Sequence, residues 1–133
     1  MRKLITVVAL FGLVSTTFAQ TETETLSWLK TNVKNLDHVN CPTINLYGSH
    51  LEITDESVRL FDENSSCKIK WNDVTDVTKK GEFFYLLTNK TIENKPLELK
   101  FYVHDTNTTD QFVKALHKMA EFKSSQIVKN DLF

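Results

Sequence analysis

Two adjacent ionisable residues, His104 and Asp105, lie between the last predicted strand and the last predicted helix. An imidazole that is oriented by a carboxylate can act as a general base, which is the chemistry of a small hydrolase. The same pair can instead be a turn histidine beside a carboxylate that caps the following helix, and we favour this interpretation. We therefore predict that the protein is not an enzyme and has no catalytic residues. A hydrolase-type enzyme that uses His104 and Asp105 is the alternative.

Motifs for metal or nucleotide cofactors do not occur in the sequence. There is no H-E-x-x-H zinc motif, no G-x-S-x-G nucleophile motif and no glycine-rich phosphate loop. His38 and His50 could meet as metal ligands, but nothing in their spacing specifies a site. Asp73 and Asp76 resemble a carboxylate pair, although this spacing in a polar segment is more typical of turns and caps. We expect no cofactor and no metal ligands.

Three lysines are candidates for a binding surface. Lys68 and Lys70 alternate along one predicted strand, and Lys100 lies on another. Together they could form a basic patch for an anionic lipid or polymer. Acidic residues are interspersed among them, which favours an ordinary solvated face of a sheet.

The first residues have the pattern of a signal peptide. Arg2 and Lys3 precede an apolar run over residues 4–14, and small residues follow up to Ala19. The run is shorter than the roughly 20 residues of a membrane-spanning helix, so we expect no transmembrane segment. The sequence therefore predicts a signal peptide over 1–19 and a single secreted or periplasmic α+β domain over 20–133. Without Arg2 and Lys3 the net charge falls from −1 to about −3, which argues against a nucleic-acid partner.

The two cysteines, Cys41 and Cys67, both lie in the predicted exported domain. An oxidising compartment permits a disulfide between them. Two buried thiols that pack as small hydrophobic groups are the alternative, since the sequence does not show how far apart the cysteines lie.

Hydrophobic periodicity predicts a helix at each end of this domain. The first, over 22–36, begins with a capping box at Thr21 and Glu24. The second, over about 109–127, has a capping box at 108–111, an apolar stripe that includes Phe112, Leu116 and Met119, and a solvated face that includes His117. We expect this stripe to cover the sheet, against Trp71, Phe83 or Phe84, and Phe101.

Between the helices, alternation of apolar and polar residues predicts an antiparallel meander. Strands are expected at 51–53 and 58–60, at 67–71, and at 82–88 and 97–103, the last two joined by a loop that contains 94–96. Residues 38–42 and 72–77 are predicted to be a break and a bend, and Ile44 and Leu46 are candidates to extend the first hairpin. Trp28 and Trp71 lie on apolar stripes, so we expect core anchors rather than a ligand pocket.

The segment 51–127 contains the predicted hairpin "LEITDESVRLF", then "CKIKWNDVTDV", an aromatic strand pair and the closing helix "TDQFVKALHKM". In this order of motifs the segment resembles bacterial PH-like domains of the pleckstrin-homology or GRAM type. The resemblance implies a curved sheet or partial barrel closed by the last helix. A cystatin-like or NTF2-like sheet wrapped on the first helix is the alternative.

The resemblance also carries an expectation about function. PH-like domains often bind phosphoinositides through basic residues of the first hairpin, but this hairpin is acidic. That ligand is therefore not transferred to this chain. We expect a non-enzymatic binding or interaction module whose partner is a protein, a peptide or an envelope component.

Overall fold

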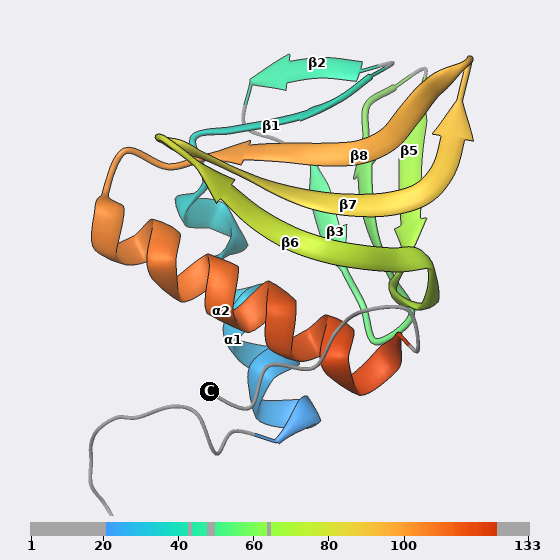
Figure 1. Cartoon of the computed structure of the whole chain (residues 1–133). Coiled ribbons are helices and arrows are strands. Elements are labelled where there is room, and N and C mark those ends of the chain that lie inside the picture. Colours follow the sequence, from blue (N-terminus) through green and yellow to red (C-terminus); the bar gives the residue numbers. More distant parts are fainter. Residues whose placement is uncertain (1–20, 43, 48–49, 64, 125–133) are drawn as a thin grey trace, which may run out of the picture.

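The computed structural model describes residues 21–42, 44–47, 50–63 and 65–124, so the predicted signal peptide lies outside the described residues. The architecture is α+β, with a helix at each end of an antiparallel set of strands (Figure 1). The elements follow the order α1 (Glu22–Asn32), η1 (Val33–Asn35), β1 (His38–Cys41), β2 (Ile44–Tyr47), β3 (Leu51–Ile53), β4 (Ser57–Phe61), β5 (Ser66–Lys70), η2 (Trp71–Asp73), β6 (Val74–Lys80), β7 (Phe83–Ile92), β8 (Lys95–Tyr102) and α2 (Thr106–Lys123).

The strands form two sheets. One has five strands in the order β2-β1-β8-β7-β6, and the other has three in the order β3-β4-β5. Every neighbouring pair is antiparallel, and within the described ranges the strands do not close into a barrel. The α+β fold predicted from the sequence is therefore confirmed.

A disulfide joins the two sheets. Cys41 of β1 and Cys67 of β5 are bonded, with their Cα atoms 6.6 Å apart. The bond attaches the five-stranded sheet to β5, an edge strand of the three-stranded sheet, and closes the chain segment that contains β2, β3 and β4. The disulfide alternative of the sequence analysis is the one observed.

The first predicted break is a strand. Residues 38–41 form β1, which pairs with both β2 and β8. Ile44 and Leu46 consequently lie on β2 and pair with β1 instead of extending the β3–β4 hairpin. A four-residue strand that ends at a proline is too short to show a recognisable alternation, which explains both errors.

The predicted bend at 72–77 is mostly a strand. A 3₁₀ turn, η2, ends at Asp73, and β6 then runs over Val74–Lys80. The register of β6 against β7 shifts between Val74 and Asp76, so Val74 and Val77 both face the core at a spacing of three residues. The bulge interrupts the alternation of apolar and polar residues by which a strand is recognised in a sequence.

The β7–β8 connection is tighter than predicted. Glu93 and Asn94 alone form the turn, both with positive φ, as two-residue hairpins of type I′ require. Lys95 and Pro96 belong to β8.

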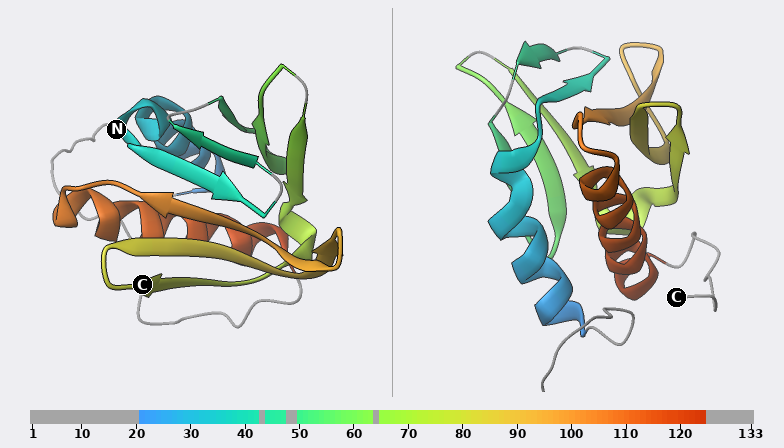
Figure 2. Two further views of the ribbon diagram at one scale, coloured as in Figure 1. Left: turned by 90° about the horizontal axis from the view of Figure 1, so that it is seen from above. Right: turned by 90° about the vertical axis from the view of Figure 1, so that its left-hand side faces the viewer.

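Helix α2 covers the inner face of the five-stranded sheet, beside α1 (Figures 1 and 2). Phe112, Leu116 and Met119 are each at most 1% exposed, as expected. The Phe112 ring packs on Phe84 at 5.9 Å and edge-on against Trp28 at 5.0 Å. Phe84, not Phe83, is therefore the inward-facing ring of β7.

The ends and one face of α2 differ from the prediction. The helix begins at Thr106 because Asp105 is its N-cap, three residues before the expected start, and it ends at Lys123. Residues 125–127 of the predicted helix lie outside the described residues. His117 is buried, not solvated: its Nδ1 lies 2.8 Å from Glu121 Oε2, one turn along the helix.

The two tryptophans contribute to the core, as expected. Trp71 is 1% exposed, and its indole Nε1 donates to the carbonyl of Thr54 at 2.8 Å. Trp28 is half-buried against Phe112.

Candidate functional site

His104 pairs with a residue that the sequence analysis did not consider. Its backbone N donates to Asp37 Oδ2 at 2.9 Å, and its Nδ1 lies 3.1 Å from the same oxygen. These hydrogen bonds from His104 hold the pKa of Asp37 below its ordinary value of 3.8. The imidazole is 79% exposed, so the pair lies on the surface. Asp37 and His104 are 67 positions apart, and only the pairing of β1 with β8 brings them together.

Asp105 caps the helix. Its carboxylate accepts hydrogen bonds from Thr108 Oγ1 at 2.6 Å and from the backbone N of Asn107 at 3.3 Å. The hydrogen bond from Thr108 is the main reason that the pKa of Asp105 lies below its ordinary value. Both oxygens are occupied by the first turn of α2, so the carboxylate is used as a cap and does not orient His104.

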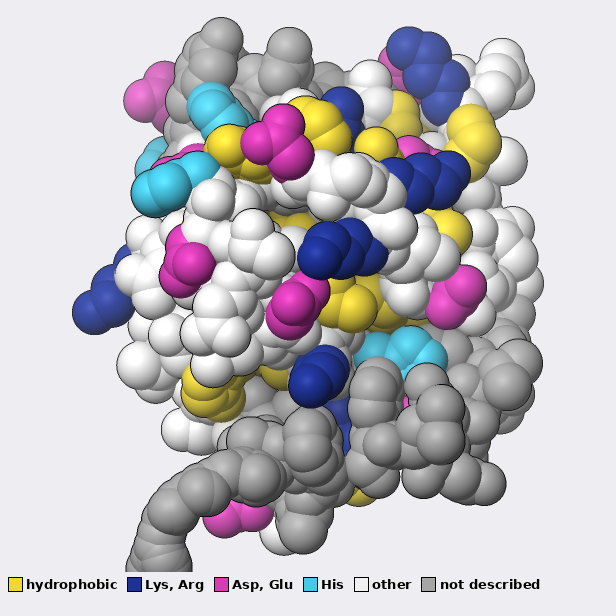
Figure 3. Space-filling model, turned by 60° about the vertical axis from the view of Figure 1, so that its left-hand side comes forward, with side chains coloured by type: hydrophobic (Ala, Val, Ile, Leu, Met, Phe, Trp, Pro, Cys, Tyr) yellow, Lys and Arg dark blue, Asp and Glu magenta, His cyan; other side chains and the backbone are white. Residues whose placement is uncertain are grey.

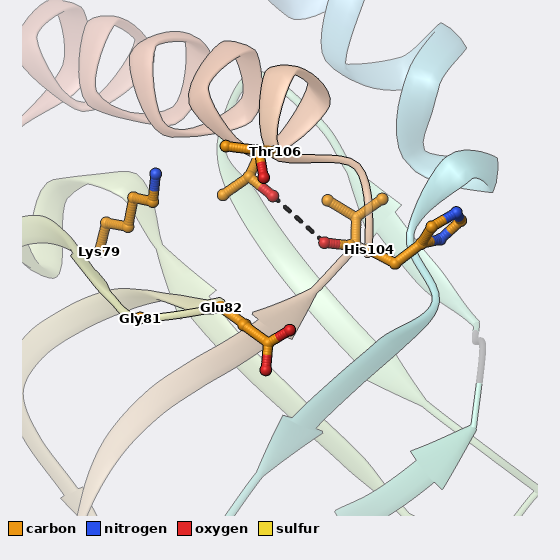
Figure 4. A pocket seen from close by; sticks show the side chains of 7 residues that line it. Lys79, Gly81, Glu82, His104 and Thr106 are labelled. Atoms are coloured by element: carbon orange, nitrogen blue, oxygen red, sulfur yellow. Dashed lines mark hydrogen bonds between the residues drawn. The ribbon is translucent and has the colours of Figure 1, made fainter.

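A small hollow of about 70 Å³ lies beside this corner, between the β6–β7 turn and the start of α2. Figure 4 shows the His104 ring directed away from Lys79 and Glu82, which lie across the hollow. Lys79 is itself paired with Asp110 of α2 at 2.9 Å. A general base needs an imidazole that points at a second polar group inside a pocket. The described residues that line this hollow do not have that arrangement.

The candidate lysines lie on different sheets. Lys68 and Lys70 are exposed on β5 of the three-stranded sheet, and Lys68 lies opposite Arg59, which is paired with Glu52 at 3.3 Å. Lys100 lies on β8 of the five-stranded sheet. Its neighbours across the strands are Asn40 and Tyr85, and its ammonium group lies over the Phe83 ring, so its environment differs from that of Lys68 and Lys70.

A group of aromatic side chains faces solvent on the five-stranded sheet. Alternate residues of β7 and β8 point away from the core, because Phe84, Leu86, Leu99 and Phe101 point into it. We define the outer aromatic face as two rows of residues that are opposite one another across β1, β8, β7 and β6. The upper row is His38, Tyr102, Phe83 and Lys80, and the lower row is Asn40, Lys100, Tyr85 and Thr78.

The rings of the upper row contact one another. Tyr102 lies 5.5 Å from Phe83 and 6.0 Å from His38, measured between ring centroids. Seen from above, strands β8, β7 and β6 lie over α2, so this surface is on the side opposite to the helix (Figure 2). In the upper half of Figure 3, hydrophobic side chains lie among lysine or arginine, histidine and acidic side chains.

Two ammonium groups lie over these rings. Lys100 Nζ is 4.1 Å from the centroid of Phe83, and Lys80 Nζ is 5.7 Å from that of Tyr85. In the part of the chain that the structure describes, neither lysine forms an ion pair. An exposed cation–π contact contributes only about 0.5–1 kcal/mol, so these charges can turn toward an anion at small cost.

Two buried oxygens lie at the ends of the lower row. Asn40 Oδ1 and Thr78 Oγ1 have no hydrogen-bond partner among the described residues. The next row down, with Glu98, Leu87 and Asp76, is acidic instead of basic. The outer aromatic face thus has aromatic surface and two lysines, and it is bounded on one side by carboxylates.

The outer aromatic face was not predicted from the sequence, although the alternation along the strands indicates part of it. The alternation that identified the core also places Phe83, Tyr85 and Tyr102 on the opposite face. Lys80 and Thr78 join them only because residues 74–80 form a strand, which the bulge concealed. Large aromatic residues at solvent-facing strand positions are the signal that could have found the site.

The histidines do not form a metal centre. His38 packs beside Tyr102, whereas His50 packs beside Phe61 of β4. Among the residues that the structure describes, no three histidine, cysteine or acidic side chains are grouped as metal ligands.

Neither a scan against protein-family models nor a search of curated proteins finds a match to this chain. Over the described ranges, no helix combines the length and the apolar character that crossing a membrane requires.

Proposed function

We propose that this protein is an exported, non-enzymatic binding module of the PH-like kind, and that the outer aromatic face holds its ligand. The observation that carries the proposal is the partial exposure of Phe83, Tyr85 and Tyr102 on one sheet face, together with two lysines that form no ion pair with any described residue. Aromatic side chains at solvent-facing positions add little to a core, but they supply rigid contact area for a ligand.

The order of elements supports the PH-like part of the proposal. Two three-stranded meanders, β3-β4-β5 and β6-β7-β8, are followed by α2, which matches the order in the resembling segment 51–127. Helix α1 and the hairpin β1–β2 precede this segment, and the hairpin extends the second meander by the pairing of β1 with β8.

The disulfide supports export, because such bonds persist in oxidising compartments and are rare in the cytosol. Export predicts cleavage before Gln20. The intact mass of the protein recovered from the medium or periplasm should correspond to a chain that begins at Gln20. A soluble exported species that retains Met1 would contradict this part of the proposal.

The hydrolase alternative gains no support from the geometry. Asp105 is a helix cap, and His104 pairs with Asp37 on the surface outside the hollow. A carboxylate beside an exposed imidazole is also a common ion pair without catalytic use.

Fluorine NMR can test the binding surface. The chain has 3 tyrosines and 2 tryptophans, so fluorotyrosine labelling places probes at Tyr85 and Tyr102, and Tyr→Phe variants assign their signals. Fluorotryptophan at the core positions Trp28 and Trp71 is the matched control. Fractions of the native envelope or medium are added to each labelled protein.

We expect at least one fraction to shift the Tyr85 and Tyr102 signals and leave the tryptophan signals in place. Shifts confined to the tryptophans would move the site to the helical side of the sheet. No shift with any fraction would contradict the proposal.

A further inference from the structure

We propose that the ligand of the outer aromatic face is an acidic carbohydrate chain, an inference that rests on the binding function proposed above. A sugar ring presents C–H groups on its faces and hydroxyl groups around its edge. A polymer of sugar acids adds a carboxylate to each unit. The ring faces and the carboxylates each have a counterpart on the outer aromatic face.

The aromatic residues match the apolar face of a sugar. Phe83 and Tyr102 are neighbours across β7 and β8 in the upper row, and Tyr85 lies in the lower row. Successive rows of a sheet are about 7 Å apart along the strands. The three rings therefore form a continuous surface on which consecutive sugar units of an extended chain can pack.

The lysines match the carboxylates. Lys80 lies in the upper row and Lys100 in the lower row, on strands that flank β7. Neither lysine has an ion-pair partner in the described ranges, and both ammonium groups lie over rings. A carboxylate that draws an ammonium group aside would also uncover the ring beneath it. Glu98 and Asp76 in the next row would repel an acidic chain and so limit it to the two rows.

The match is carried by the rings and the lysines. The oxygens Asn40 Oδ1 and Thr78 Oγ1 at the ends of the lower row are buried, so they are not contact points for a ligand on this surface.

Other polyanions fit the chain less well. Nucleic-acid binding depends mainly on an extensive basic surface, but the whole chain has 16 basic and 17 acidic residues. A membrane surface favours protruding apolar side chains, whereas these rings lie against a sheet and are only partly exposed. The nearly balanced charge of the chain and the flat arrangement of the rings on the sheet together favour a carbohydrate ligand.

The experiment uses the disulfide-bonded exported protein labelled with fluorotyrosine. Four probes are titrated at low salt: polygalacturonate, neutral dextran, an oligothymidylate and vesicles that contain phosphatidylglycerol. The test variant is Lys80→Gln/Lys100→Gln, and the matched control is Lys68→Gln/Lys70→Gln, which removes the same charge from the three-stranded sheet. Unchanged tryptophan spectra verify that each variant is folded.

We expect polygalacturonate to shift the Tyr85 and Tyr102 signals and dextran to have a much smaller effect. Lys80→Gln/Lys100→Gln should weaken the affinity for polygalacturonate about tenfold, and the control variant should change it by less than about twofold. Equal losses in the two variants would overturn the proposal, because they would indicate a response to net charge alone.

The same titrations separate this inference from the proposed function. If the oligonucleotide or the vesicles shift the two tyrosines and polygalacturonate does not, the surface stands and its carbohydrate ligand is wrong. If dextran binds as tightly as polygalacturonate, the acidic character of the ligand is wrong. If no probe moves the tyrosines but fractions of the native envelope do, only the ligand class fails.

Discussion

Strands β7 and β8 carry two aromatic pairs at neighbouring positions, one on each face of the sheet. Phe84 and Phe101 are opposite one another on the inner face, at most 1% exposed and stacked at 5.0 Å. Phe83 and Tyr102 are opposite one another on the outer face, partly exposed, at 5.5 Å. The two pairs have similar chemistry and the same backbone, so burial is the main difference between them.

Because of this difference in burial, we expect the inner pair to stabilise the fold and the outer pair to be available for binding. The inner pair is covered by Phe112 of α2, so removing either ring would leave a cavity that the packed helix cannot fill. No described element covers the outer pair, and its remaining contacts are with Lys100 and His38. A residue whose removal hardly affects the fold is free to serve a ligand.

Substitution of one ring from each pair gives the largest contrast. Phe84→Ala should lower the free energy of unfolding by about 3–5 kcal/mol. Phe83→Ala should lower it by about 1 kcal/mol or less, since a half-exposed cross-strand pair contributes little. Urea unfolding followed by tryptophan fluorescence measures both. Comparable losses would mean that the outer pair is structural, and the binding surface would lose its main support.

Loss of the disulfide should have the next largest effect. The Cys41→Ala/Cys67→Ala variant should be less stable by about 3–4 kcal/mol, because the bond closes a loop of about 26 residues in the unfolded chain. Thermal unfolding with and without reductant measures the difference in the wild type, and the variant should not respond to reductant. Two thiols labelled in the natively exported protein under denaturing, non-reducing conditions would contradict the bond itself.

The helix that covers the inner face offers a second contrast. Leu116→Ala should cost about 2–5 kcal/mol, since Leu116 is 1% exposed against the sheet. Lys118→Ala, on the same helix, should change stability by less than about 0.5 kcal/mol. The urea concentration at the midpoint of unfolding, measured for each variant, tests this difference. Equal midpoints would mean that α2 is peripheral to the core.

The elements that sequence analysis identified correctly are those with a sustained period. Helix α2, the β3–β4 hairpin and the β7–β8 pair all follow alternation or helical spacing over several residues. The elements that it missed are too short, as β1 is, or interrupted by a bulge, as β6 is. Both segments were predicted to be a break or a bend. The residues that β1 and β6 contribute to the outer aromatic face could therefore not be placed on it from the sequence.

Tertiary pairing explains what the sequence could not show about His104. The favoured interpretation of Asp105 as a helix cap agrees with the structure, but the sequence did not indicate a partner for His104. Its actual partner, Asp37, reaches it only through the pairing of β1 with β8. His117 was predicted to face solvent because its helical neighbours are charged. In the structure it is nearly buried together with Glu121, one turn along the helix, with which it pairs.

The smallest expected effect concerns the Asp37–His104 pair, on the exposed side of the comparison. The pKa of Asp37 is lowered in the folded protein, so its contribution to stability is present above the unfolded value of 3.8 and is lost as the pH falls through the folded value. Asp37→Asn removes this ionisation. The pair is largely exposed, so water screens it, and we expect a loss of about 0.5 kcal/mol or less near pH 6.

The pH dependence distinguishes this contribution from a simple packing effect. The stability difference between wild type and Asp37→Asn should shrink toward zero as the pH is lowered from 6 to below 3.8, because the wild-type carboxylate becomes protonated. Glu98→Gln, which removes a carboxylate from the acidic row of the same sheet, is the matched control. Urea unfolding at several pH values measures each difference. A difference of several kcal/mol, or one that persists at low pH, would show that this exposed corner helps to hold the fold, and the division between a structural inner face and an available outer face would be wrong.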